Sequence, residues 1–405
     1  MTRWRWPALI VLLLGSRLGY VLLSAEGRNP PVADAETYVA MASNIARGDG
    51  MHFEGSYSLR PPGYPVFLAG VFKLTGHSLI RAQIVQVFLA LATAFLVFKI
   101  ASFYFDERIA WMTCLIYAIS YDAFIIPATF LSENLYAFML VLSIYLLMKD
   151  RYILAAVSLS ITCFTRQEAF LLILFVVLMH ALRGLRENLK RIAAILAVFF
   201  VLESAWAYRN WTIHHKVLLG TTLSEIHLFL SNAYIFQRLG YEGDIDHSKL
   251  LRQEKGVTEL QMMEKGRKVC ADLFERQPLH RLLLAPFLKL GFFLYPFLPG
   301  YDLTFMLIFP FWLLGLYLGR HDWRKYYLLY GVFSVVLGLL LVFHAQPRYR
   351  GPYCPFMAIF AAACLSDLWT KSLKHRASIV GWALVNVVIG IAGEHARSAV
   401  RSLLP

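Results

Sequence analysis

The chain has 405 residues, of which 58% are hydrophobic and only 16% are charged, and its mean hydropathy is +0.56. A single soluble core cannot bury this much apolar surface, so the composition excludes an ordinary soluble domain and predicts lipid-facing helices. The net charge is +13, but the Lys and Arg residues form short clusters between apolar runs, which argues against a nucleic-acid-binding protein. The five cysteines are scattered without a CxxC pattern, so neither a structural metal nor a disulfide framework is expected.

Apolar segments of roughly membrane-spanning length recur along the chain, and they predict about eleven transmembrane helices. The first segment follows Arg3 and Arg5 as a signal peptide would, but no convincing cleavage site follows it, so we expect a retained span. The segments are 7–23, 82–97, 109–126, 130–148, 152–164, 169–182, 192–208, 303–318, 326–343, 352–368 and 377–391.

Two further apolar segments, 61–74 and 282–299, are short, rich in proline and aromatic residues, and interrupted by Lys73 and Lys289. They are expected to lie at the membrane interface instead of crossing the bilayer. With both segments on the surface, all basic clusters fall on one side, which the positive-inside rule assigns to the cytoplasm. These clusters are Arg3/Arg5, Lys99/Arg108, Lys149/Arg151, Arg183/Arg186/Lys190/Arg191, Arg320/Arg324/Lys325 and Lys371/Lys374/Arg376.

The sequence therefore predicts an all-α, polytopic integral membrane protein whose polar motifs gather in two long outer loops. We expect juxtamembrane helices and the chemistry of the protein in these loops. The predicted parts are a first span (1–23), a first outer loop (24–81), spans two to seven (82–208), a second outer loop (209–302), and the last four spans with a C-terminal tail (303–405).

The first outer loop contains a short amphipathic pattern on which a functional carboxylate is placed. Asp34 follows two prolines, apolar residues recur at helical spacing from Tyr38 onward, and Gly48 ends the pattern. Asp34 is either the N-cap of this helix or a functional acid, and its position alone leaves both open. Further along, Arg60 precedes two prolines, which predict an extended turn into the next apolar segment.

The pattern D-x-x-x-Y-x-x-x-A from Asp34, followed by R-P-P-G-Y-P from Arg60, resembles the first outer loop of dolichyl-phosphate-mannose-protein mannosyltransferase-like glycosyltransferases. This group has the GT-C architecture and includes the aminoarabinose transferases that modify lipid A. Many relatives carry an acidic pair at the first motif, whereas here Ala35 separates Asp34 from Glu36. The likeness continues through Ser132-Glu133-Asn134, Thr165-Arg166, the run from Trp206 to Asn210, and Arg348-Tyr349-Arg350-Gly351-Pro352.

The resemblance implies a GT-C type helical bundle that transfers a sugar, with inversion, from a polyprenyl-phosphate donor to a hydroxyl of a glycolipid, glycan or protein. The reaction is expected on the outer side of a bacterial or archaeal cell membrane. Such a reaction needs a base for the acceptor hydroxyl, cations for the leaving phosphate and a groove for the lipid. The resemblance implies that Asp34 is the catalytic base and that the substrate is bound by Glu36, Tyr38, Arg60, Glu133, Arg166, Arg209, Arg348, Tyr349 and Arg350.

Plainer roles remain open for several of these residues. Arg348 and Arg350 suit a phosphate because a guanidinium donates two parallel hydrogen bonds, but arginines at helix ends also reach toward lipid headgroups. Arg166 and Arg209 lie at helix ends and are equally compatible with anchoring. In the same way, Glu133 either binds a sugar hydroxyl or stabilises a helix start, and Arg60 either contacts the donor or fixes its turn.

The second outer loop contains adjacent histidines and a second amphipathic pattern. Consecutive residues point apart on a helix, and no third ligand has recognisable spacing, so His214 and His215 do not predict a metal site. The run 257–276 predicts an amphipathic helix, which is either a lid over the acceptor side or a solvated connector. No metal or other cofactor is predicted, although a divalent cation near Asp34 and Glu36 remains possible for this kind of enzyme.

Two other classes of protein fit the pattern of spans. A secondary transporter or flippase of an amphiphile would explain Glu203 inside a predicted span, but no inverted repeat or matching pair of Gly/Pro-broken spans is apparent. A non-catalytic scaffold of the same fold would bind glycolipid or a partner without transfer. Sugar transfer from a lipid donor identifies the enzyme, and gradient-driven uptake by proteoliposomes identifies the transporter.

Overall fold

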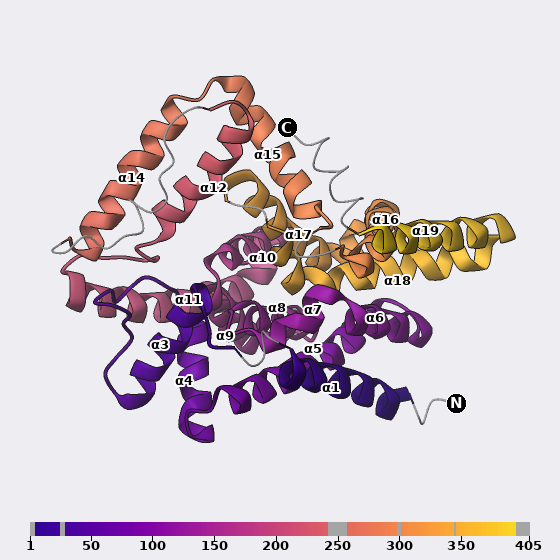
Figure 1. Cartoon of the computed structure of the whole chain (residues 1–405), viewed down its shortest axis with the longest axis horizontal. Helices are drawn as coiled ribbons and strands as arrows, with labels where there is room; N and C mark the ends of the chain where they lie inside the picture. Colours follow the sequence, from indigo (N-terminus) through magenta and orange to yellow (C-terminus); the bar gives the residue numbers. More distant parts are fainter. Residues whose placement is uncertain (1–4, 25–28, 242–256, 298–300, 344–345, 394–405) are drawn as a thin grey trace.

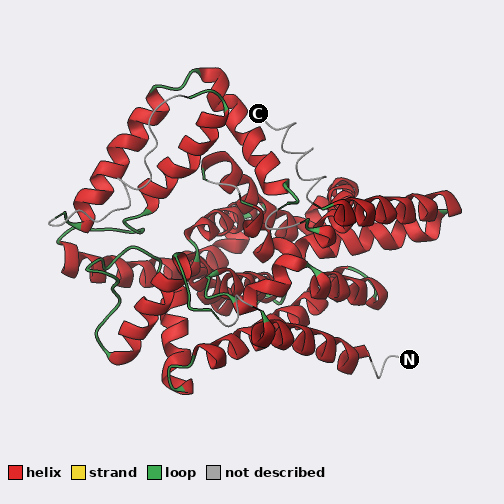
Figure 2. Cartoon of the chain, viewed as in Figure 1, coloured by secondary structure: helices red, strands yellow, loops and turns green. Residues whose placement is uncertain are grey.

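The computed structural model of the chain describes residues 5–24, 29–241, 257–297, 301–343 and 346–393. These residues form α-helices, short 3-10 helices and loops, and no named strand occurs among them (Figure 2). The predicted all-α fold class is confirmed.

Each of the predicted spans coincides with a helix or a pair of helices, and both short apolar segments are helical as well (Figure 1). Pro299, at the end of the second short segment, lies outside the described residues. The helices are α1 (Arg5–Leu23), α3 (Asp34–Arg47), α4 (Gly63–Thr75), α5 (Leu79–Tyr104), α6 (Glu107–Ile119), α7 (Tyr121–Ile125), η2 (Ile126–Ala128), α8 (Glu133–Met148), α9 (Tyr152–Thr165), η3 (Gln167–Ala169), α10 (Phe170–Leu182), α11 (Leu185–His214), α12 (Ser224–Arg238), α14 (Glu259–Glu275), α15 (Leu279–Leu294), α16 (Leu303–Gly319), η4 (Arg320–Asp322), α17 (Trp323–Val342), η5 (Pro347–Tyr353), α18 (Cys354–Lys371) and α19 (Leu373–Ala392).

Several helices are long and apolar enough to cross a bilayer, which confirms a multi-pass membrane protein. Within the described ranges there are six such stretches, or seven if the bent pair α6 and α7–η2 is one span. One stretch contains both α16 and α17. These two helices pack side by side and antiparallel: the rings of Trp312 and Phe333 lie 5.7 Å apart, and the Tyr330 hydroxyl donates to the Leu316 carbonyl. Helices α8, α9 and α10 are apolar but shorter, so helix length does not establish the predicted number of eleven spans.

The central bundle is held by close contact between apolar helices, as expected where lipid removes the hydrophobic drive between them. Helix α16 packs on α18, α8 on α9, and α5 on both α6 and α8. At Gly315 of α16, an added Cβ would lie 2.4 Å from the carbonyl oxygen of Phe360. Glycine at this position therefore lets the backbones of α16 and α18 approach each other.

The span made by α6 and α7 is broken at Ser120 by 67°, which the continuous apolar run 109–126 did not predict. Arg17 of α1 lies against the break, where its guanidinium donates to the carbonyls of Ala118 and Ala123, both at 3.3 Å. The bent backbone leaves these carbonyls without a complete helical ladder, and Arg17 supplies donors to them. Arg17 is fully buried.

Residues from three predicted basic clusters or their neighbours meet at one end of the bundle. Arg183 donates to the carbonyl of Arg324 at 2.8 Å, and Lys325 donates to the carbonyl of Tyr104 at 3.4 Å. Figure 1 shows α3, α12 and α14 at the other end, far from the start of α1 and the α18–α19 turn. The side of the membrane that each end faces stays a prediction.

Helices α12, α14 and α15 form a triangular group beside the bundle (Figure 1). Their inner faces make a small apolar core, in which the rings of Phe236 and Phe274 lie 5.6 Å apart. An added Cβ at Gly266 would lie 2.6 Å from a side-chain atom of Ile226, so α14 lies close to α12 there. Helix α14 confirms the amphipathic helix predicted over 257–276.

Candidate active site

A cavity of about 400 Å³ lies where α3, η3, α10, α12, α17 and η5 meet. One part of its wall is apolar and comes from two neighbouring helices and the loop after α17: Phe170, Leu171, Gly338, Leu339, Val342 and Phe343. The other part carries acids, arginines, hydroxyls and an imidazole: Asp34, Tyr38, Arg60, Ser132, Glu133, Thr165, Arg166, Gln167, Glu168, Thr221, Ser224, His227, Ser231, Arg348 and Tyr349.

Asp34 is the only described acid that two arginines contact from separate loops within this cavity. Its Oδ1 accepts from Arg60 Nη2 at 2.5 Å, and its Oδ2 accepts from Arg348 Nη2 at 3.2 Å. Of the two roles left open for Asp34, the N-cap is wrong, because Ala33 occupies the N-cap position and no side chain caps α3. Burial alone raises the pKa of Asp34, but the guanidinium groups of Arg60 and Arg348 outweigh it, so the net pKa lies below its usual value.

Arg60 is held on three sides at the wall of the cavity. Besides Asp34, it contacts His227 Nε2 at 3.3 Å, and its guanidinium carbon lies 5.6 Å from the ring centre of Tyr38. The turn after Arg60 packs against the end of α9, where an added Cβ at Gly63 would lie 2.8 Å from backbone atoms of Phe164. The predicted Pro-Pro-Gly turn therefore needs glycine here because the backbones of two segments nearly touch.

Arg166 forms a second charged group on the cavity wall. It pairs with Glu133 at 3.0 Å and with Glu168, and its guanidinium carbon lies 4.9 Å from the ring centre of Tyr349. Tyr349 also lies under Arg348, at 5.2 Å from the guanidinium carbon. The structure thus brings together five predicted residues, Asp34, Arg60, Glu133, Arg166 and Arg348, of which the first and last are 314 residues apart. Tyr38 and Tyr349 complete the group.

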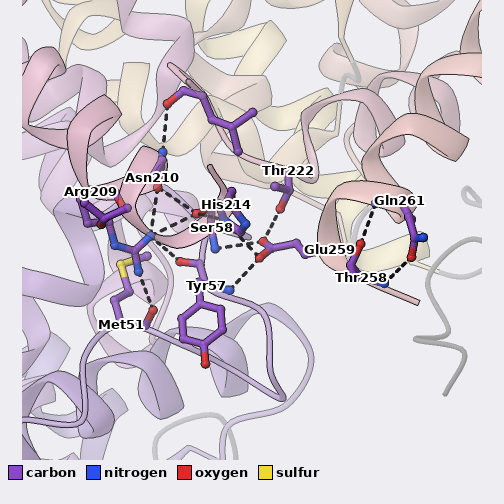
Figure 3. Close-up of polar contacts among 12 residues, drawn as sticks. Met51, Tyr57, Ser58, Arg209, Asn210, His214, Thr222, Thr258, Glu259 and Gln261 are labelled. Carbon is purple, nitrogen blue, oxygen red and sulfur yellow. Dashed lines mark hydrogen bonds and ion pairs between the residues drawn. The ribbon is translucent and has the colours of Figure 1, made fainter. Parts of the chain in front are cut away.

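Three of the predicted substrate-binding residues do not line the cavity. Arg350 is buried, where it pairs with Asp302 at 3.0 Å and with Asp122 at 3.4 Å. Arg209 donates to the carbonyls of Tyr57 and Met51, both at 2.8 Å, and so holds the loop before Arg60 (Figure 3). Glu36 is exposed on α3.

The structure adds two titratable cavity residues, Glu168 and His227, that the sequence analysis did not select. Glu168 lies two residues after Arg166, and its acidic charge after a predicted span was an available signal. His227 had no comparable signal, because its contact with Arg60 joins positions 167 residues apart. Among the residues that the structure describes, no group of three or more His, Cys, Asp and Glu is placed to hold a metal ion.

Comparison with known proteins gives a family match over the middle of the chain. Residues 59–208, less than half of the chain, match the family model described as dolichyl-phosphate-mannose-protein mannosyltransferase. The predicted family resemblance is confirmed. The matched range of this mannosyltransferase-like chain includes Arg60, Glu133 and Arg166. No curated protein sequence matches the chain.

Solved structures with the same fold are polytopic GT-C enzymes. The oligosaccharyltransferase AglB from Archaeoglobus fulgidus, in complex with an inhibitory peptide and a dolichol-phosphate, has a TM-score of 0.53 at 15% identity, covering 96% of this chain and 55% of that one. The Archaeoglobus enzyme tethered to an acceptor peptide has a TM-score of 0.54 at 15% identity, covering 96% of this chain and 54% of that one. ArnT from Cupriavidus metallidurans bound to undecaprenyl phosphate has a TM-score of 0.44 at 13% identity, covering 89% of this chain and 78% of that one. The chain spans about half the length of the archaeal enzymes, and the likeness to them confirms the predicted GT-C type fold.

Proposed function

We propose that this protein is a membrane glycosyltransferase that moves a sugar from a polyprenyl-phosphate donor to an acceptor hydroxyl, with inversion at the anomeric carbon. The acceptor is a glycolipid, a glycan or a protein. The observation that carries the proposal is the Asp34 carboxylate between Arg60 and Arg348, at the polar part of a cavity whose other wall is apolar. A lipid-linked sugar phosphate has matching polar and apolar parts.

In this proposal Asp34 is the general base. It takes the proton of the acceptor hydroxyl while the hydroxyl oxygen bonds to the anomeric carbon and the bond from that carbon to the phosphate oxygen breaks. The electron pair leaves with the polyprenyl phosphate. The two guanidinium groups keep Asp34 ionised, which a base requires.

Arg348 is the cation that we assign to the leaving phosphate. Its side chain is 44% exposed, whereas Arg166 is held by two carboxylates and Arg60 is enclosed by Asp34, His227 and Tyr38. A guanidinium close to the developing negative charge stabilises the transition state, and its planar fork suits two phosphate oxygens. Arg350 is left out of this role because its guanidinium is already shared by Asp122 and Asp302.

The apolar wall suits the isoprenoid chain of the donor. Phe170 and Leu171 of α10 lie beside Gly338 and Leu339 of α17 in this wall. Burying an isoprenoid chain against these helices is favourable because it removes apolar surface from water. AglB has been solved with a dolichol-phosphate and with an acceptor peptide, which supports the same chemical classes of ligand for this chain.

We further propose that the cavity faces the outer side of a bacterial or archaeal cell membrane. Support comes from the basic residues, such as Arg183 and Lys325, which gather at the opposite end of the bundle. Nucleotide sugars are made in the cytoplasm, so an outward-facing site requires a lipid-linked donor.

The test uses purified protein with a radiolabelled sugar on a polyprenyl phosphate and, separately, the matching nucleotide sugar. We expect transfer to an acceptor extract only from the lipid-linked donor, and loss of this transfer in Asp34→Asn. Asp49→Asn is the matched control, since Asp49 is 54% exposed on the surface and pairs with Arg47. Equal use of the nucleotide sugar contradicts the proposal. Gradient-driven uptake without transfer favours the transporter, and failure of both assays favours the scaffold.

A further inference from the structure

We propose that Glu259 is a positioning residue that holds Arg60 against Asp34 by joining two segments of the cavity wall. The inference rests on the proposed function, in which Asp34 is the base. Glu259 does not line the cavity, so any effect it has on the reaction must pass through its neighbours.

Glu259 is the first residue of α14, and its side chain is not needed to cap the helix. Thr258 and Gln261 form a capping box there. The Thr258 hydroxyl accepts from the backbone N–H of Gln261 at 3.3 Å, and the Gln261 side-chain oxygen accepts from the backbone N–H of Thr258 at 2.8 Å. The Glu259 carboxylate is directed away from its own helix into the group of polar contacts in Figure 3. The residue is only 7% exposed.

The carboxylate receives donors from two separate loops. It accepts from the backbone amides of Tyr57 and Ser58, at 2.8 Å and 2.9 Å, and from the hydroxyl of Thr222. The Thr222 amide also donates to the Ser58 carbonyl at 3.0 Å. His214 Nε2 lies 3.7 Å from the carboxylate. A buried carboxylate with several donors holds the donor segments firmly in place, because a hydrogen bond to an ionised acceptor is stronger than one between neutral groups.

Both loops continue directly into the cavity wall. Ser58 is followed by Leu59 and Arg60, while Thr222 is preceded by Thr221 and followed by α12, which carries His227. Arg60 contacts that same His227 at 3.3 Å. Glu259 therefore fixes the two backbones whose side chains meet beside Asp34.

A second layer restrains the same loop without contacting Glu259. Ser58 is fully buried and its hydroxyl donates to Asn210 Oδ1 at 2.9 Å, while Arg209 donates to the carbonyl of Tyr57. These bonds hold the loop against the end of α11. Asn210 also donates to the carbonyl of Leu218 at 3.0 Å, in the loop before α12, so Glu259 and Thr222 share the link between the two loops with the end of α11.

Glu259→Gln tests the proposal, and Glu264→Gln is its control. Glu264 lies on the same helix, is 52% exposed and pairs only with Lys216 at 2.9 Å among the described residues. Gln at position 259 presents a single acceptor oxygen and no charge to three donors, so the two loops are held less firmly, with the bond from the Thr222 amide to the Ser58 carbonyl still in place. We expect kcat to fall about tenfold with donor KM nearly unchanged, because orientation of the reacting groups is lost while donor binding is kept. Glu264→Gln is expected to behave as wild type.

The readout specific to positioning is the titration of Asp34. The charged and titratable groups that face Asp34 are Arg60, Arg348 and His227. If Glu259 acts through Arg60, Glu259→Gln shifts the acid limb of the pH–rate profile upward, and it causes no further shift in an Arg60→Gln background. A loss of folded protein would lower the rate at every pH without moving that limb. An equal shift in the Arg60→Gln background, or no shift at all, overturns the proposal.

Two further measurements cover the other ways in which the test can fail. If Glu259→Gln does not fold, Thr222→Val removes one donor at constant side-chain shape and is expected to shift the limb in the same direction. If wild-type protein transfers no sugar, the proposed function fails. The Asp34 carboxyl can still be titrated by infrared difference spectroscopy, in which the band that is lost in Asp34→Asn is assigned to Asp34. An unchanged Asp34 band in both Glu259→Gln and Thr222→Val then refutes the positioning role by itself.

Discussion

Arg348 and Arg350 are two residues apart on η5, yet Arg348 donates to Asp34 in the cavity at 3.2 Å while Arg350 pairs with buried Asp302 at 3.0 Å. The two side chains leave the 3-10 turn in different directions. The middle of η5 is therefore fixed by the buried ion pair of Arg350, while Arg348 near its start faces the cavity.

This difference predicts opposite phenotypes for the two arginines. Arg350→Gln leaves two buried carboxylates without their cation and should destabilise the protein by about 3–5 kcal/mol. Arg348→Lys keeps the charge but loses the planar fork, so transfer should fall while the melting temperature is unchanged. Thermal unfolding and transfer are measured on the same detergent preparations. A stable Arg350→Gln protein, or an Arg348→Lys protein with full activity, contradicts the assignment.

Asp34→Asn is expected to affect transfer and donor binding in opposite directions. Loss of the base should lower the rate by about two to four orders of magnitude. Binding of a polyprenyl phosphate should become tighter, because Arg348 no longer has a carboxylate partner and the phosphate meets less negative charge. Binding is measured with a fluorescent polyprenyl phosphate, with Asp49→Asn as control. Weaker binding by Asp34→Asn would place the phosphate away from Arg348.

The lowered pKa of Asp34 gives a definite pH dependence of stability. Since its pKa is lower in the folded protein than in the unfolded chain, ionised Asp34 stabilises the fold above the unfolded pKa. This contribution is lost as the pH falls through the folded pKa. The melting temperature of wild type should exceed that of Asp34→Asn at neutral pH, and the difference should shrink in acid. A difference that grows toward acid pH would mean that burial, not the arginines, controls Asp34.

The cavity can be narrowed at its apolar wall by a substitution at one glycine, Gly338. A Cβ at Gly338 would lie 2.1 Å from Leu171 Cδ1, and both residues line the cavity. Gly338→Ala should push Leu171 into the space that we assign to the lipid and raise donor KM about tenfold or less, with a smaller effect for a short-chain donor. Gly331→Ala is the control, because it crowds Phe175 on the same helix pair outside the cavity. Equal effects of both variants would remove the lipid assignment.

Single-cysteine labelling tests which end of the bundle faces outward. Cysteines placed at Asp49 and Glu264 should react with an impermeant maleimide in intact cells, whereas cysteines at Arg186 and Lys374 should be protected. The native cysteines are all buried, which keeps the background low. Labelling at Lys374 from outside would mean that one of the short apolar helices, α4 or α15, crosses the membrane.

Much of the fold follows from features that are local in the sequence. Apolar run lengths predicted where the helices lie, and Gly48 ends α3 with a positive φ of 92°, as its pattern indicated. The break at Ser120 was missed because 109–126 has the length of a single apolar span. Arg17 donates to carbonyls on both sides of the break, and no local pattern records this contact.

The site could be predicted only where motifs carried its residues. Asp34, Arg60 and Arg348 lie in such motifs, and the structure brings them to one cavity. His227 and Glu259 were missed because their partners are fixed by tertiary contacts over long sequence distances. A motif also cannot say which of two nearby arginines turns inward, since that depends on where buried acids such as Asp302 lie.

The buried Arg17 has a consequence for how the protein is made. It belongs to the first helix, but the carbonyls that accept its hydrogen bonds, those of Ala118 and Ala123, are synthesised 101 and 106 residues later. An arginine within an isolated span makes insertion less favourable, with a cost of about 2.5–3.5 kcal/mol at the centre of the span. Helix α1 is therefore expected to remain beside the translocon, or under the protection of a chaperone, until the broken span emerges and the two are assembled together.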